Sequence, residues 1–130
     1  MLEVGTKARQ TILVTPQNTA KALGSGGLEV FATPAMVALM EKTAAESVQG
    51  QLDEGFGTVG TSISVKHTAP TPLSMAVTCE SELIEVDGRR LVFELTVSDE
   101  SGSIGSGSHE RFIINNEKFL KKVNEKINKT

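Results

Sequence analysis

The sequence predicts an α+β fold, in which an antiparallel sheet of about five strands packs against one central helix and a second helix ends the chain. Two observations lead to this prediction. Apolar and polar residues alternate with strand periodicity in several segments, whereas residues 36 to 48 carry apolar or small residues at helical spacing. A chain of 130 residues suits one domain, which we expect to span residues 1–130.

The first segment with strand character covers residues 8 to 15, and Pro16 ends it. Residues 17 to 30 show no clear period and contain Gly24, Gly26 and Gly27. We therefore expect a mobile loop there. Long loops in compact domains often act as lids over a site.

The central helix has clear start signals. Thr33 is a suitable N-cap residue, and Pro34 suits the first helical position. Gly50 or Gly55 is expected to end the helix. Its apolar and small positions are Met36, Leu39, Met40, Thr43, Ala44, Ser47 and Val48.

Four further strands are predicted over residues 58 to 67, 73 to 86, 90 to 98 and 103 to 114. Asp87 and Gly88 lie between two of them and indicate a hairpin. Glycines in the last strand indicate a bulge or a close approach to the backbone. Residues 116 to 129 form a lysine-rich amphipathic segment, which predicts the terminal helix.

Composition excludes several classes of protein. A formal net charge of -3, with both signs mixed, argues against a nucleic-acid partner. The single cysteine, Cys79, allows no intrachain disulfide and favours a reducing compartment. No signal peptide or membrane span is apparent, so we expect a soluble cytoplasmic protein. Two distant histidines and one cysteine argue against a metal site, and we expect no cofactor.

Three residues are candidates for chemistry. Glu41 follows Thr33 by about two helical turns, on an adjoining face and beside the apolar stripe. It is either a base or nucleophile in a dry cleft or an acid that reaches solvent at the edge of the stripe. Thr33 is either a simple cap or a group beside helix N–H donors that hold a carbonyl oxygen or a developing oxyanion.

The two histidines differ in position. His67 shares strand parity with Val59, Ile63 and Val65, so it should point toward the helix. It either contacts the substrate or is satisfied by a backbone carbonyl near Pro70. We interpret His109 as an exposed cross-strand partner.

Residues 31 to 41, 57 to 69, 86 to 91 and 104 to 111 resemble the fluoroacetyl-CoA thioesterase family of hot-dog proteins. The resemblance implies the hot-dog fold, with the sheet wrapped around the central helix. It implies a catalytic set of Thr33, Glu41 and His67. It also implies substrate contacts at Gly60 and Arg111.

The activity implied is hydrolysis of a short acyl-CoA thioester, with CoA as part of the substrate. Glu41 either activates water or attacks the carbonyl directly. Residues 22 to 30 lack the aromatic lid of the fluorinated-substrate enzyme, so we expect a different acyl group. The alternative is a non-catalytic acyl-CoA or small-ligand binding module. One helix cannot cover the sheet and its edges, so we expect a homodimer, or a tetramer built from dimers.

Overall fold

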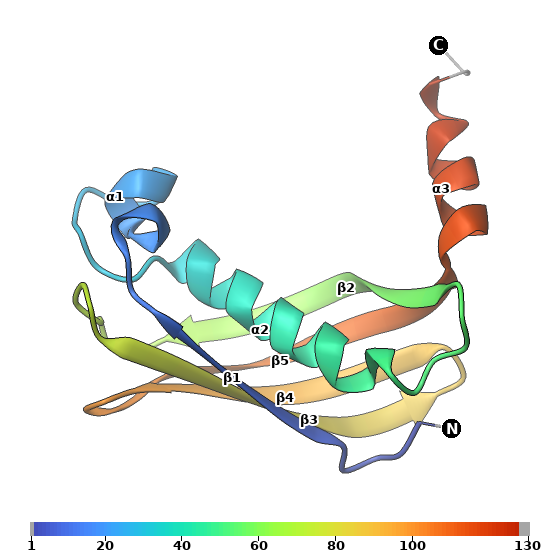
Figure 1. Cartoon of the computed structure of the whole chain (residues 1–130), viewed down its shortest axis with the longest axis horizontal. Coiled ribbons are helices and arrows are strands. Elements are labelled where there is room, and N and C mark those ends of the chain that lie inside the picture. Colours follow the sequence, from blue (N-terminus) through green and yellow to red (C-terminus); the bar gives the residue numbers. More distant parts are fainter. Residues whose placement is uncertain (1, 128–130) are drawn as a thin grey trace.

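The computed structural model describes residues 2–127 and contains one five-stranded antiparallel sheet around a long helix (Figure 1). The predicted α+β architecture is confirmed. The elements are β1 (Lys7–Leu13), the 3-10 helix η1 (Pro16–Asn18), α1 (Ala20–Leu23), α2 (Thr33–Gln49), β2 (Phe56–His67), β3 (Ala76–Asp87), β4 (Arg90–Asp99), β5 (Gly102–Asn115) and α3 (Asn116–Asn124).

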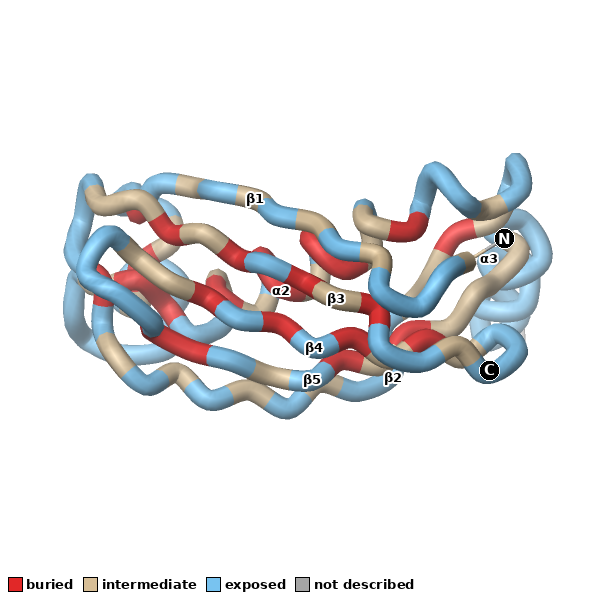
Figure 2. The backbone as a smooth tube through the Cα atoms, turned by 90° about the horizontal axis from the view of Figure 1, so that it is seen from below, coloured by how far each residue is buried: buried red, intermediate tan, exposed pale blue. Residues whose placement is uncertain are grey.

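The strands lie in the order β1-β3-β4-β5-β2, and each neighbouring pair is antiparallel. The sheet curves around α2, and buried and exposed residues alternate along β3 and β4 (Figures 1 and 2). The buried face of α2 packs on the inner face of the sheet and excludes water from both. Its buried residues are Met36, Leu39, Met40, Thr43, Ala44 and Val48.

The glycines of β5 let α2 approach the sheet closely, as their positions predict. A Cβ atom on Gly105 would lie 2.9 Å from the Met36 side chain, and one on Gly107 would lie 2.9 Å from that of Met40. Odd-numbered residues in this part of β5 therefore face α2. His109 and Arg111 continue this inner row.

The segment between β1 and α2 contains two short helices, whereas the sequence predicts a loop there. It contains η1 and α1, because Thr19 caps α1 by accepting a hydrogen bond from the Ala22 N–H at 3.2 Å. Gly24 ends α1 in the left-handed region, with φ of 72°. The expectation of an entirely irregular loop is therefore wrong.

A β-bulge divides β2 into two halves. Gly60 pairs with Arg111 and Ser62 pairs with Glu110, so Thr61 is an extra residue on this strand. The bulge changes which parity faces α2. Thr58 and Gly60 face inward before it, and Ile63 and His67 face inward after it. The prediction that Val59 shares a face with His67 is wrong for this reason.

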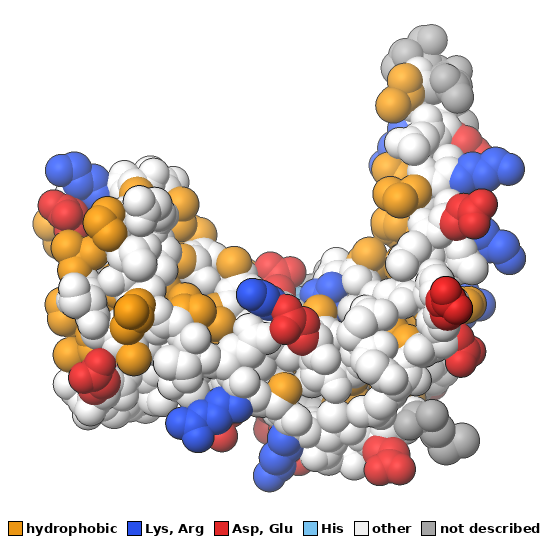
Figure 3. Space-filling view, viewed as in Figure 1, with side chains coloured by type: hydrophobic (Ala, Val, Ile, Leu, Met, Phe, Trp, Pro, Cys, Tyr) orange, Lys and Arg blue, Asp and Glu red, His pale blue; other side chains and the backbone are white. Residues whose placement is uncertain are grey.

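The terminal helix α3 stands away from the sheet (Figure 1). Asn115 caps it by accepting a hydrogen bond from the Lys118 N–H at 3.0 Å. The helix ends at Asn124, before the predicted end at residue 129, which lies outside the described residues. Hydrophobic side chains gather along one side of α3, and Phe119 and Val123 are among its exposed residues (Figure 3).

Two expectations from composition concern the described residues only. Within residues 2–127, no helix is both long and apolar enough to cross a membrane. Cys79 is buried in the core, and burial raises the pKa of its thiol to about 11. It is therefore a small core residue, as its alternation with Val77 predicts.

Candidate active site

The N-terminus of α2 contacts the end of β2 through two side chains. The Thr33 hydroxyl lies 2.7 Å from Nδ1 of His67. Thr33 is the first residue of α2, whereas Ala32 occupies the N-cap position and makes no side-chain cap. The prediction that Thr33 is the N-cap is therefore wrong. Its hydroxyl binds the imidazole instead of the helix backbone.

The other nitrogen of this imidazole has no partner in the described part of the chain. Nε2 of His67 is buried and makes no hydrogen bond. Buried polar atoms in proteins are nearly always paired, so an orphaned nitrogen next to a helix terminus suits contact with a ligand. The alternative that a carbonyl near Pro70 satisfies His67 is wrong, because Thr33 is its partner. The Phe31 ring meets the imidazole edge-on, with centroids 6.4 Å apart.

Glu41 belongs to a second group of side chains on the same face. Its Oε2 lies 4.0 Å from Nη1 of Arg111, and the two side chains are 43% and 10% exposed, respectively. The carboxylate therefore reaches solvent on one side and a buried cation on the other. Glu41 therefore lies at the solvent edge of the apolar stripe, as one of the two interpretations expects. It also has a charged partner there, Arg111.

Arg111 is fixed by its inner neighbours. Its Nε donates to the Thr58 hydroxyl at 2.8 Å, and its Nη2 donates to the Thr58 carbonyl at 2.9 Å. Its Nη1 lies 3.0 Å from Nε2 of His109. Burial lowers the pKa of Arg111 below its ordinary value, and the Glu41 carboxylate opposes this shift. The guanidinium is thus a fixed positive group beside Glu41.

Gly60 lies where these groups meet. A Cβ atom at this position would be 3.0 Å from Cε1 of His109, 3.1 Å from Oε2 of Glu41 and 3.3 Å from Nη1 of Arg111. Contacts this short require a neighbour to move. Glycine therefore keeps the backbone of β2 open next to the Glu41 carboxylate.

The structure thus brings the five candidate residues into two groups. Thr33 contacts His67, and Glu41 contacts Arg111 beside Gly60. Between residues 2 and 127, no hydrogen bond or ion pair joins one group to the other. Glu41 lies about 12 Å along the helix axis from Thr33, as two helical turns require.

His109 is a buried residue that the sequence interpretation missed. The residue is 2% exposed, so the prediction of an exposed cross-strand partner is wrong. Nδ1 lies 2.8 Å from the Ser62 carbonyl oxygen. Burial lowers the pKa of His109. Its shared parity with Gly105 and Gly107 is the signal that places it on the inner face.

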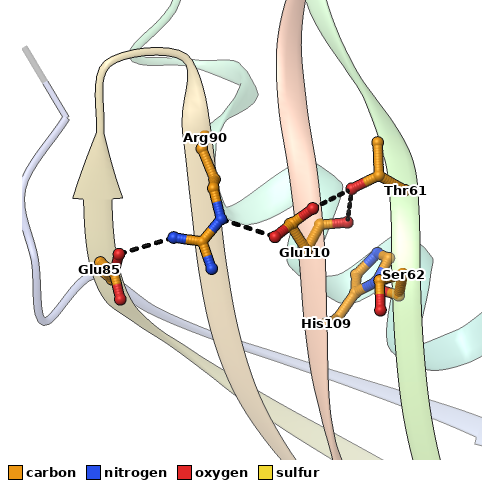
Figure 4. A network of polar contacts seen from close by, with 6 residues as sticks. All are labelled: Thr61, Ser62, Glu85, Arg90, His109 and Glu110. Atoms are coloured by element: carbon orange, nitrogen blue, oxygen red, sulfur yellow. Dashed lines mark hydrogen bonds and ion pairs between the residues drawn. The ribbon is translucent and has the colours of Figure 1, made fainter.

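The neighbouring Glu110 belongs to a separate network on the other face of the sheet (Figure 4). It accepts from Nε of Arg90 at 2.6 Å and from the Thr61 hydroxyl at 2.7 Å. Arg90 also contacts Glu85 at 2.7 Å. The hydrogen bonds from Thr61 and Arg90 lower the pKa of Glu110. The network fastens the bulge residue Thr61 to β5.

Known proteins are similar to this chain over most of its length. The family model described as "Fluoroacetyl-CoA-specific thioesterase" matches residues 14–117. A fluoroacetyl-CoA thioesterase from Streptantibioticus cattleyicolor is 40% identical to the chain, over 96% of this chain and 94% of its own length. The chain belongs to the fluoroacetyl-CoA-specific thioesterase family.

Solved structures of similar proteins agree with this family and with the hot-dog fold. A crystal structure of a mutant of the fluoroacetyl-CoA-specific thioesterase FlK has a TM-score of 0.91 and 39% identity, and the match covers 97% of this chain and 98% of that chain. A hot-dog-like protein from Thermanaerovibrio acidaminovorans has a TM-score of 0.89 and 30% identity, over 96% and 93% of the two chains.

Proposed function

We propose that this member of the fluoroacetyl-CoA-specific thioesterase family hydrolyses a short acyl-CoA thioester to a carboxylic acid and free CoA. Thr33, Glu41 and His67 are its catalytic residues, and Gly60 and Arg111 contact the substrate. One observation carries the proposal most directly. His67 bonds to Thr33 through Nδ1 at the start of α2, while its buried Nε2 has no hydrogen-bond partner among residues 2–127.

The Thr33 hydroxyl fixes what His67 offers to a substrate. When this hydroxyl donates to Nδ1, the imidazole carries its proton on Nε2. Nε2 is then a donor for an oxygen or sulfur atom of the bound acyl-CoA, and the positive end of the α2 dipole favours negative charge there.

Glu41 supplies the negative group that the reaction requires. As a base, it removes a proton from water, whose oxygen then bonds to the thioester carbon while the carbon–sulfur bond breaks. As a nucleophile, it forms an anhydride with loss of the CoA thiolate, and water then hydrolyses the anhydride. The fixed guanidinium of Arg111 faces the carboxylate in both routes. Thiolate and proton combine to give free CoA.

The acyl group is proposed to be short and not selected for fluorine. Residues 22 to 30 contain no aromatic residue, and Phe31 alone follows them. Phe31 is buried and meets the His67 ring, so it packs inside the protein instead of forming a gate at the surface. The segment over the start of α2 therefore offers few aromatic contacts to an acyl chain.

A homodimer is the proposed form of the enzyme, with tetramers as a further possibility. β2 is an edge strand, and the backbone groups along its outer edge invite pairing with another strand. The exposed Phe119 and Val123 of α3 also favour contact with a second copy. We further propose that residues 1–130 work as one domain in the cytoplasm, without a cofactor. Size-exclusion chromatography with light scattering tests the dimer, and a strict monomer would contradict it.

The test of the activity is thiol release from acetyl-, fluoroacetyl-, propionyl- and butyryl-CoA. We expect the wild type to release thiol, and we expect Glu41→Ala and His67→Ala to lose at least about a hundredfold in kcat/KM. Glu54→Ala changes an exposed acid outside the site and should keep the wild-type rate. A wild type that binds CoA esters but releases no thiol would establish the binding module instead.

A further inference from the structure

We propose that His109 is a positioning residue that orients the Arg111 guanidinium toward Glu41 and Gly60. This inference rests on the proposed function, because it explains how Arg111 is presented to the substrate. His109 is not in the proposed catalytic set. It is buried, and its Cε1 would lie 3.0 Å from a Cβ atom added at Gly60.

The hydrogen bonds of His109 determine its protonation state. A carbonyl oxygen only accepts, so the ring must donate from Nδ1 to the Ser62 carbonyl oxygen at 2.8 Å. A guanidinium only donates, so Nε2 must accept from Nη1 of Arg111 at 3.0 Å. Only the neutral ring with its proton on Nδ1 satisfies both partners.

The contact with His109 uses the same nitrogen that faces Glu41. Nη1 of Arg111 lies 3.0 Å from the His109 ring and 4.0 Å from the Glu41 carboxylate. The two bonds to Thr58 hold the other side of the guanidinium. Without an acceptor at Nε2 of His109, Nη1 loses its inner anchor and the guanidinium rotates about the Thr58 contacts.

Packing fixes the ring that makes this contact. Phe93 is the cross-strand partner of His109, and their ring centroids are 6.3 Å apart. On the other side, the bulge at Thr61 brings the Ser62 carbonyl to Nδ1. The ring is thus held between β4 and β2, and its orientation is transmitted to Arg111.

The charged groups around His109 make the contact sensitive to pH. Burial lowers the pKa of the ring most, the Ser62 carbonyl raises it, the Arg111 cation lowers it, and the Glu41 carboxylate from α2 raises it. Phe93 from β4 carries no charge. The net direction is down, so the ring is neutral near pH 7. When acid protonates it, Nε2 becomes a donor and repels Arg111.

Two variants separate positioning from packing. His109→Gln offers a side-chain oxygen to Nη1 but does not titrate, and His109→Phe keeps a ring against Phe93 but offers no acceptor. We expect His109→Phe to lower kcat/KM about tenfold or more at pH 7.5. We expect His109→Gln to stay within about threefold of wild type at that pH. Below pH 6, His109→Gln should lose less of its rate than wild type does.

A readout without substrate keeps this inference separate from the proposed function. Nitrogen-15 NMR of the histidines should show wild-type His109 as the neutral Nδ1–H tautomer at pH 7. Its pKa should lie below 6.5, the ordinary value for histidine. If wild type hydrolyses no thioester, the proposed function fails and the NMR result still decides whether His109 anchors Arg111. A charged ring or an Nε2–H tautomer at pH 7 would overturn the inference. So would full activity in His109→Phe.

Discussion

The Thr33 hydroxyl, 2.7 Å from Nδ1 of His67, joins the first residue of α2 to the last residue of β2. A threonine at the start of a helix ordinarily caps it. Here Ala32 is the cap residue, and the hydroxyl serves the imidazole. The contact with His67 therefore distinguishes Thr33 from an ordinary N-cap residue. The helix-start signal in the sequence does not make this distinction.

Replacing this hydroxyl should reduce activity more than stability. Thr33→Val keeps the shape of the side chain but leaves Nδ1 of His67 without its partner. We expect kcat/KM to fall roughly tenfold to a hundredfold, as loss of one hydrogen bond in a site does. Thr33→Ser restores the hydroxyl and should recover most of the rate. Thiol-release kinetics on both variants check this, and an equal loss in Thr33→Ser would contradict it.

A methyl group at Gly60 should disturb the group around Glu41. The Cβ of Gly60→Ala would lie 3.1 Å from the Glu41 carboxylate and 3.0 Å from the His109 ring, so one of them must move. We expect kcat/KM to fall about tenfold or more, because small displacements in a site are costly. Gly50→Ala is the matched control, since φ is -69° there and no atom lies within 4 Å of the added Cβ. The control should keep the wild-type rate.

His109 should make the folded state less stable in mild acid. Its pKa is lowered below 6.5 in the folded protein, so the unfolded chain takes up a proton first as the pH falls. The free energy of unfolding therefore drops as the pH falls from 6.5 through the folded-state pKa. Urea unfolding of wild type and His109→Gln at pH 7.5 and 5.5 measures this. Wild type should lose more stability than the variant, and equal losses would rule out the effect.

Cys79 should resist thiol reagents while the protein is folded. The thiol is buried, and burial raises its pKa to about 11, so almost none is ionised at pH 8. Iodoacetamide should modify it only after unfolding, which intact-protein mass spectrometry detects. Rapid modification of the native protein would show that the core opens at Cys79.

Periodicity predicts most of the fold, because each strand and helix buries one face. The positions of Met36 and Met40 on α2 and the glycines of β5 follow from spacing alone. The bulge at Thr61 does not, since alternation along β2 looks continuous in the sequence. The order in α1 also escapes prediction, because a four-residue helix is too short to show a period.

The candidate site is less predictable for a different reason. Thr33 has two compatible roles at a helix start, and only the position of His67 decides between them. His109 follows an inner row whose direction depends on where α2 lies. The partners of Arg111 come from Thr58, far along the chain, through the register of β2 and β5. Such cross-strand contacts depend on pairing and not on local pattern.

The bulge at Thr61 changes which residues of β2 face α2. Before it, even-numbered residues such as Gly60 look toward α2, and after it odd-numbered residues such as His67 do. Deleting Thr61 would remove this change of parity and turn Thr58 and Gly60 outward, while the Thr33–His67 pair stayed in place. A single residue thus determines whether both halves of the candidate site face α2. An insertion or deletion near Thr61 would turn one half away from α2 without replacing any residue in either half.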